Sequence, residues 1–199
     1  MRQIIISALQ AEAEPIINHY NLEQDSNYNY PVFNRDNLTM ICTGVGRENV
    51  RRVIFDYYSK ILEWSNFQFI NVGIAGGKKG KCKIGQCFLI DRVFDDRLDK
   101  VYKLNNLFDS KISSNSITTV TNPVIDGGDE HNWLVDMEAH EICSVTDDFD
   151  YLKNLFIIKI VSDYMDIGEN FFNYNRVKDL VEDNLLQIDK FLDELQKYK

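Results

Sequence analysis

The chain has 199 residues, a length that favours a single domain. Hydrophobic residues make up 44% of it and aromatic residues 12%, which suits a packed core and excludes a disordered chain. Acidic residues outnumber basic ones by 31 to 22, giving a formal net charge of -9. Such a chain repels a phosphate backbone, so nucleic acid is not expected as its main partner.

The four cysteines, Cys42, Cys82, Cys87 and Cys143, form no CxxC pair, and the three histidines add no zinc-binding spacing. They are typical of reduced thiols in a cytoplasmic protein. The apolar start at 4–6 is too short for a signal peptide. No apolar run is long enough to span a bilayer, so we expect no membrane partner.

The first third of the chain alternates between strand and helix patterns. Residues 2–8 form a short apolar run that predicts a central strand, and 9–20 predict a helix in which Pro15 should lie in or near the first turn. Residues 30–33 and 38–43 predict a β-hairpin.

Two glycine-containing segments follow. Thr43–Gly46 precedes a predicted helix over 47–62, but Asn49 stands where a dinucleotide fingerprint needs its third glycine. A tight turn is therefore at least as good an interpretation as a phosphate-binding loop. A predicted strand over 67–72 runs into 73–77, where three glycines are expected to let the backbone approach another group and turn sharply.

The remaining elements complete an alternating α/β pattern, which predicts a mostly parallel or mixed sheet covered by helices. The predicted elements are strands over 86–93, 100–104, 117–121 and 156–163, a solvated turn at 126–130, a loop rich in aromatic residues over 164–174, and a long amphipathic helix over 176–198.

Three acidic residues lie where α/β proteins place their chemistry. Glu12 follows the first predicted strand, and Asp163 ends the apolar strand predicted over 156–163. Residues 135–140 read as a helix start in which Asp136 can cap the helix and Glu138 lies in the first turn. The competing interpretation is that Glu138 is an ordinary helix-dipole acid and Asp163 an ordinary turn residue.

Four blocks of residues, taken in order, resemble the nucleoside phosphorylase superfamily, and most of all its 5′-methylthioadenosine/S-adenosylhomocysteine nucleosidase branch. The blocks are Ile4–Ala8 with Glu12, Thr43–Gly46, Asn71–Gly77 through Gly85, and Val135–Ala139 paired with Ile160–Asp163. The resemblance implies one domain over 1–199 with a three-layer α/β/α fold around a central mixed, twisted sheet. It also implies cleavage of the bond between ribose and base, without a metal or other cofactor.

The resemblance assigns roles to matching positions. Glu12 matches a water-activating glutamate, Glu138 the glutamate that binds the ribose hydroxyls, and Met137 a methionine lying against the sugar. Asp163 matches the acid that protonates the purine, with Ser162 beside it. The other substrate-contacting positions that it implies are Ala8, Ile74, Ala75, Gly76, Val124, Asp136 and Phe171.

The chain also departs from the family pattern. Ile74 replaces a serine, Asp136 a glutamate and Lys159 an arginine, and the region over 95–130 is shortened. Because that region often contributes to the pocket and to dimer contacts, the substrate and the assembly stay open, and a homodimer is one candidate assembly.

Breaking an N-ribosidic bond builds positive charge on the sugar and negative charge on the base, so carboxyl groups on opposite sides of the bond suit the reaction. We therefore predict a nucleosidase that uses water, with Glu12 and Asp163 roughly 6.5–9.5 Å apart by analogy with inverting glycosidases. A phosphorylase is the alternative: Asn71 and Ile74 argue against phosphate, whereas Arg47 beside Gly46 keeps it possible. A nucleoside-binding protein without activity is the third hypothesis.

Overall fold

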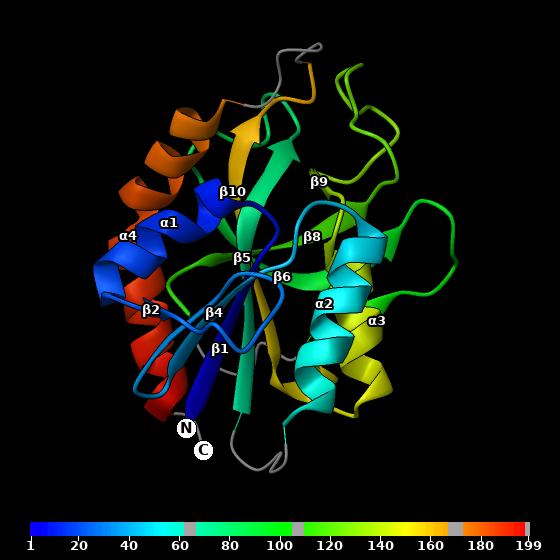
Figure 1. Cartoon of the computed structure of the whole chain (residues 1–199). Coiled ribbons are helices and arrows are strands. Elements are labelled where there is room, and N and C mark those ends of the chain that lie inside the picture. The colour runs from blue at the N-terminus through cyan, green and yellow to red at the C-terminus, as the bar shows by residue number, and fades with distance from the viewer. Residues whose placement is uncertain (62–66, 105–109, 167–172, 198–199) are drawn as a thin grey trace.

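The computed structural model describes residues 1–61, 67–104, 110–166 and 173–197. Helices α1 (Gln10–Tyr20) and α4 (Tyr174–Lys197) cover one face of a mixed β-sheet, and α2 (Arg47–Ser59) and α3 (Ala139–Asp148) cover the other (Figure 1). The predicted three-layer α/β/α fold is confirmed. No helix within the described ranges combines the length and the apolar character needed to cross a bilayer.

The sheet closes partly on itself. Its strands are β1 (Arg2–Ser7), β2 (Glu23–Gln24), β3 (Val32–Arg35), β4 (Leu38–Cys42), β5 (Phe67–Gly77), β6 (Cys87–Asp95), β7 (Tyr102–Lys103), β8 (Ser113–Thr119), β9 (Leu134–Asp136) and β10 (Leu155–Asp163). Their order is β10-β6-β8-β9-β5-β1-β4-β3-β2, with β7 beside β6. Because β10 also pairs with β5, the strands β5, β10, β6, β8 and β9 form a closed ring of pairings.

Strand β5 is the centre of this arrangement. It runs parallel to β1 on one side and to β10 on the other, so the carboxyl ends of all three strands meet at one edge of the sheet. The register pairs Ile6 with Asn71 and Asp163 with Gly76. Apolar side chains fill the core on both faces: Tyr58 of α2 packs on Phe69 with ring centroids 4.5 Å apart, and Phe191 of α4 packs on the opposite face.

Most elements match their predicted ranges, including the hairpin formed by β3 and β4, the short strand β7 and the long helix α4. Pro15 differs: it lies inside α1, beyond the first turn. Its neighbours Ala13 and Ile16 are fully buried, and this packing outweighs the backbone hydrogen bond that a proline cannot donate.

Three other boundaries were wrong. The glycine block does not turn, because β5 continues to Gly77 and pairs there with β9. Strand β8 begins at Ser113, since its polar residues pair in parallel with β6. Residues 134–136 form β9 rather than the start of a helix, and α3 begins at Ala139.

A buried ion pair connects β10 to β9 across β5. Lys159 is 2% exposed, and its Nζ lies 2.8 Å from Oδ2 of Asp136. A Cβ atom on Gly73 of β5 would come within 3.3 Å of the ammonium group, so the glycine leaves the space that the lysine occupies. Burial alone would lower the pKa of Lys159, but the charges of Asp136, Glu138 and Glu12 raise it above the usual value. The lysine is therefore held in its charged form.

We predict that Lys159→Met destabilises the fold by about 3–5 kcal/mol at pH 8, because it leaves buried carboxylates without their cation. The loss should shrink towards pH 5.5. The folded-state pKa values of Glu12 and Glu138 are already raised, and removing the lysine raises them further. Groups with raised folded-state pKa values stabilise the fold when protonated and lose that contribution as the pH rises through those values.

Urea unfolding of the variant and the wild type at both pH values measures this effect. Lys60→Met is the matched control, since Lys60, the residue after α2, forms an exposed pair with Asp56 of that helix, worth about 0.3–0.5 kcal/mol. A loss at Lys159 that is equally small, or that does not depend on pH, would contradict the assigned role.

Candidate active site

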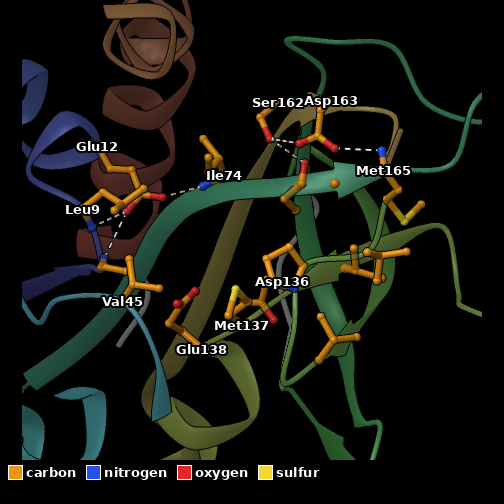
Figure 2. Close-up of a pocket in the computed structure, with 17 residues that line it drawn as sticks. Leu9, Glu12, Val45, Ile74, Asp136, Met137, Glu138, Ser162, Asp163 and Met165 are labelled. Carbon is orange, nitrogen blue, oxygen red and sulfur yellow. Dashed lines mark hydrogen bonds between the residues drawn. The ribbon is translucent and has the colours of Figure 1, made fainter. Parts of the chain in front are cut away.

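A cavity of about 270 Å³ opens at the carboxyl ends of β1, β5 and β10, with largely apolar walls (Figure 2). Eleven of the twelve predicted site residues line it: Ala8, Glu12, Ile74, Ala75, Gly76, Val124, Asp136, Met137, Glu138, Ser162 and Asp163. The twelfth, Phe171, lies outside the described residues. The sequence therefore located one site from segments far apart in the chain.

Glu12 is fixed by the backbone around it. Its Oε2 accepts the N–H groups of Ala8 and Leu9 at 3.0 and 2.9 Å, and its Oε1 accepts that of Ile74 at 2.8 Å. The first two bonds tie the side chain to the start of its own helix, and the third ties it to β5. Burial raises the pKa of Glu12, against the opposing effects of Lys159 and the three amides. A carboxylate held in this way can orient a water molecule and accept its proton.

Glu138 is the residue just before α3, and it is 8% exposed. Its Oε1 accepts the N–H of Gly46 at 3.0 Å, so the glycine turn after β4 contacts this acid instead of forming a separate phosphate loop. Burial raises the pKa of Glu138 to about 7, and the nearby charge of Asp136 adds to the rise. Glu138 therefore changes its charge near neutral pH.

Asp136 has a different environment, because its two oxygens already have protein partners. Oδ1 accepts the hydroxyl of Thr119 at 2.7 Å, and Oδ2 accepts the N–H of Ala139 at 2.8 Å besides pairing with Lys159. The expectation that Asp136 caps the helix was wrong, because Glu138 holds the N-cap position of α3 and Asp136 ends β9, from where it accepts the N–H of the first helical residue. Asp136 lines the cavity, and its hydrogen bonds indicate that it positions Lys159 and Glu138.

Asp163 lies on the other side of the cavity from Glu12 and Glu138, as Figure 2 shows. Its Oδ2 accepts the hydroxyl of Ser162 at 2.6 Å, and its Oδ1 accepts the N–H of Met165 at 2.7 Å. These donors fix the carboxyl group at the end of β10. A group positioned there can exchange a proton with a ligand in the cavity.

Two glycines of β5 mark the separation between the acids. A Cβ atom on Gly73 would lie 3.0 Å from Oε1 of Glu12, and one on Gly76 would lie 3.3 Å from Oδ1 of Asp163. Three residues of an extended strand span about 10 Å, so the acids lie beside two well-separated points of the same strand. The predicted 6.5–9.5 Å between the carboxyl groups of Glu12 and Asp163 stays a prediction.

No lysine or arginine is among the described residues that line the cavity. Arg47, which kept phosphate binding possible, bonds Asp95, Asp96 and the carbonyl oxygen of Thr119. Its guanidinium group is thus committed to neighbouring carboxylates. In the described parts of the chain, no three His, Cys, Asp or Glu side chains are grouped to hold a metal ion.

The sequence reasoning did not select six lining residues: Leu9, Val45, Val120, Pro123, Val135 and Met165. Val45 and Val135 belong to the motif blocks, and Leu9 follows Ala8, so proximity to the motifs could have indicated them. Met165 had a weaker signal, since it follows the strand that ends in Asp163 by two residues. Lys159 does not line the cavity, and its position in β10 gave no indication that it neutralises the acids.

No family model matches the chain, and no curated protein sequence is significantly similar to it. Solved structures do share its fold. The apo 5′-methylthioadenosine nucleosidase of Arabidopsis thaliana has a TM-score of 0.81 at 17% identity, covering 100% of this chain and 97% of that one. A putative 5′-methylthioadenosine/S-adenosylhomocysteine nucleosidase of Borrelia burgdorferi, bound to adenine, has a TM-score of 0.75 at 20% identity, covering 99% and 100%.

A futalosine hydrolase mutant of Helicobacter pylori is similar to the same extent, with a TM-score of 0.75 at 13% identity over 98% of this chain and 100% of that one. The similar structures thus include nucleosidases described for different substrates. At these identities the likeness establishes the fold, and it confirms the structural resemblance to the nucleosidases that the motif blocks predicted.

Proposed function

We propose that the protein is a purine nucleosidase that hydrolyses the N-ribosidic bond of an adenine-type nucleoside, such as 5′-methylthioadenosine or S-adenosylhomocysteine. The observation that carries the proposal is the separation of acids across one apolar cavity: Glu12 and Glu138 on one side, Asp163 on the other. Such a cavity suits a flat base with an uncharged sugar.

In the proposed reaction, Asp163 acts as the general acid and donates a proton to the purine while the bond to the sugar breaks. The bonding electron pair leaves with the base, which becomes neutral as N7 takes the proton. A water molecule attacks the sugar carbon and gives a proton to Glu12, whose raised pKa makes it the better acceptor. The net result is one free base, one free sugar and a proton moved from Asp163 to Glu12, which solvent returns.

Glu138 is proposed to hold the ribose hydroxyls. An ionised carboxylate accepts both hydroxyl hydrogens, and its negative charge stabilises the positive charge that develops on the sugar. Met137 lies in the cavity wall beside it and can contact the sugar ring. This arrangement uses the same buried charge in binding and in the transition state.

Water fits the site better than phosphate does. A phosphate dianion needs charge-assisted donors, whereas the described cavity wall contains carboxylates, no cation, and Ile74 in place of a hydroxyl residue. Lys159 is close to Glu12, but it is paired with Asp136. We therefore favour hydrolysis over phosphorolysis. The presence of Glu12, Glu138 and Asp163 together also argues against a nucleoside-binding protein without activity.

Cleavage should proceed in phosphate-free buffer and release free ribose or a 5′-substituted ribose. Chromatography of the products tests this prediction. The substrates are assayed with and without phosphate, and they are adenosine, inosine, 5′-methylthioadenosine and S-adenosylhomocysteine. Added phosphate should not raise the rate, because the site lacks donors for it. A strict phosphate requirement with ribose 1-phosphate as product would instead establish a phosphorylase, and inertness towards the whole panel would favour a binding protein.

Asp163→Asn should still bind nucleoside but lose about 10²–10⁴-fold in kcat, because an amide cannot supply the proton to the departing base. Calorimetry on the variant separates binding from turnover. Ser162→Ala is the matched comparison and should lose less, since Ser162 only orients the carboxyl group. If Asp163→Asn turned over adenine nucleosides at nearly the wild-type rate, another group would have to be the acid.

The KM of the wild type should rise as the pH falls from 8 to 5.5. The pKa of Glu138 is about 7, so acid converts it from a carboxylate to a neutral group that binds the ribose hydroxyls less well. Glu138→Gln should raise KM and lower kcat together, and its KM should depend less on pH. Equal cleavage of 2′-deoxyadenosine and adenosine by the wild type would exclude the ribose contact.

A further inference from the structure

Met165 adopts an unusual backbone conformation just after Asp163. Its φ is 58°, in the left-handed region that non-glycine residues seldom occupy. Its N–H donates to Oδ1 of Asp163 at 2.7 Å, and its carbonyl oxygen accepts the N–H of Gly127 at 2.8 Å. The residue is therefore held from both sides, and its side chain is directed into the protein, where it is 1% exposed.

The side chain of Met165 fits between two glycines. A Cβ atom on Gly76 would lie 2.8 Å from its Cγ, and one on Gly128 would lie 2.9 Å from its Cε. It packs with Val120 and Val135 and forms part of the cavity wall on the same side as Asp163 (Figure 2). The lack of side chains at both glycines thus allows a long thioether at this end of the cavity.

In the proposed binding mode, Met165 lies beside the purine edge that carries N7 and the 6-substituent. In the proposed function, Asp163 protonates N7, and N7 shares an edge of the purine with the substituent at position 6. The same carboxyl group that meets N7 is bonded by the backbone of Met165. The side chains also lie beside the same strand position, since a Cβ atom on Gly76 would lie 2.8 Å from Cγ of Met165 and 3.3 Å from Oδ1 of Asp163. In the proposed binding mode, the side chain of Met165 is therefore next to the purine edge that carries the 6-substituent.

We propose that Met165 is a specificity-determining residue that closes the base end of the cavity and restricts the substrate to purines with a small 6-substituent, such as an amino or oxo group. This inference rests on the proposed function. A thioether is a weak acceptor and has no donor, so Met165 discriminates by size and not by hydrogen bonding.

The test compares adenosine with N6-benzyladenosine, which differ only at the 6-position. The wild type should prefer adenosine in kcat/KM by about 100-fold, the order of discrimination that an apolar pocket provides. Met165→Ala should reduce this preference by at least about 10-fold, because the shortened side chain opens the base end. A preference that is unchanged in the variant, or absent in the wild type, would overturn the proposal.

Two further variants keep the test decisive. Met165→Gly removes the same side chain and suits the positive φ, so it serves if the alanine variant folds poorly. Met137→Ala makes the same change in the same cavity, at the proposed sugar contact. Met137→Ala should lower kcat/KM for both nucleosides and leave the ratio of the two kcat/KM values unchanged. If it changed this ratio as much as Met165→Ala does, Met165 would not be specific for the base.

Failure of the proposed function can be distinguished from failure of this inference. If the wild type cleaves neither nucleoside, calorimetry with adenine and N6-benzyladenine still measures the shape of the base end. Adenine should then bind the wild type at least about 10-fold more tightly, and the difference should narrow in Met165→Ala. Equal binding of both bases to the wild type, or no binding of either, would overturn the inference.

Discussion

The buried ammonium group of Lys159 is the constraint on which the site depends. Glu12, Asp136 and Glu138 lie close enough for their charges to act on it, and without a cation their mutual repulsion inside the protein would be costly. The lysine reaches this point because β5 has a glycine, Gly73, where β10 passes it. One position without a side chain thus permits both the ion pair and the approach of Glu12 to the strand.

The same constraint divides the cavity into two chemically different sides. On one side the lysine only partly offsets burial, so the pKa values of Glu12 and Glu138 remain raised. On the other side Asp163 is held by the Ser162 hydroxyl and the Met165 amide. The cavity thus presents carboxyl groups on both sides of a bound ligand, and the proposed N-ribosidase uses Glu12 as the proton acceptor for water and Asp163 as the proton donor for the base.

The fold could be predicted from short-range patterns in the sequence, and the location of the site from the motif blocks that resemble the nucleosidases. Apolar runs ending at Ala8 and Asp163 predict strands whose carboxyl ends meet, and periodicity identifies α4. The pairing of β9 with Gly76 and Gly77, and the ion pair of Lys159, depend on contacts between distant segments. No local pattern predicts such contacts, so these features required the structure.

A crystal structure of the Asp163→Asn variant with 5′-methylthioadenosine bound tests the account most directly, because the impaired acid should preserve the intact nucleoside. The account predicts N7 of the purine beside the substituted position, the ribose hydroxyls at Glu138, and a water molecule between Glu12 and the sugar carbon. A nucleoside bound in the reverse orientation, with its base against Glu138, or bound outside the cavity, would contradict it.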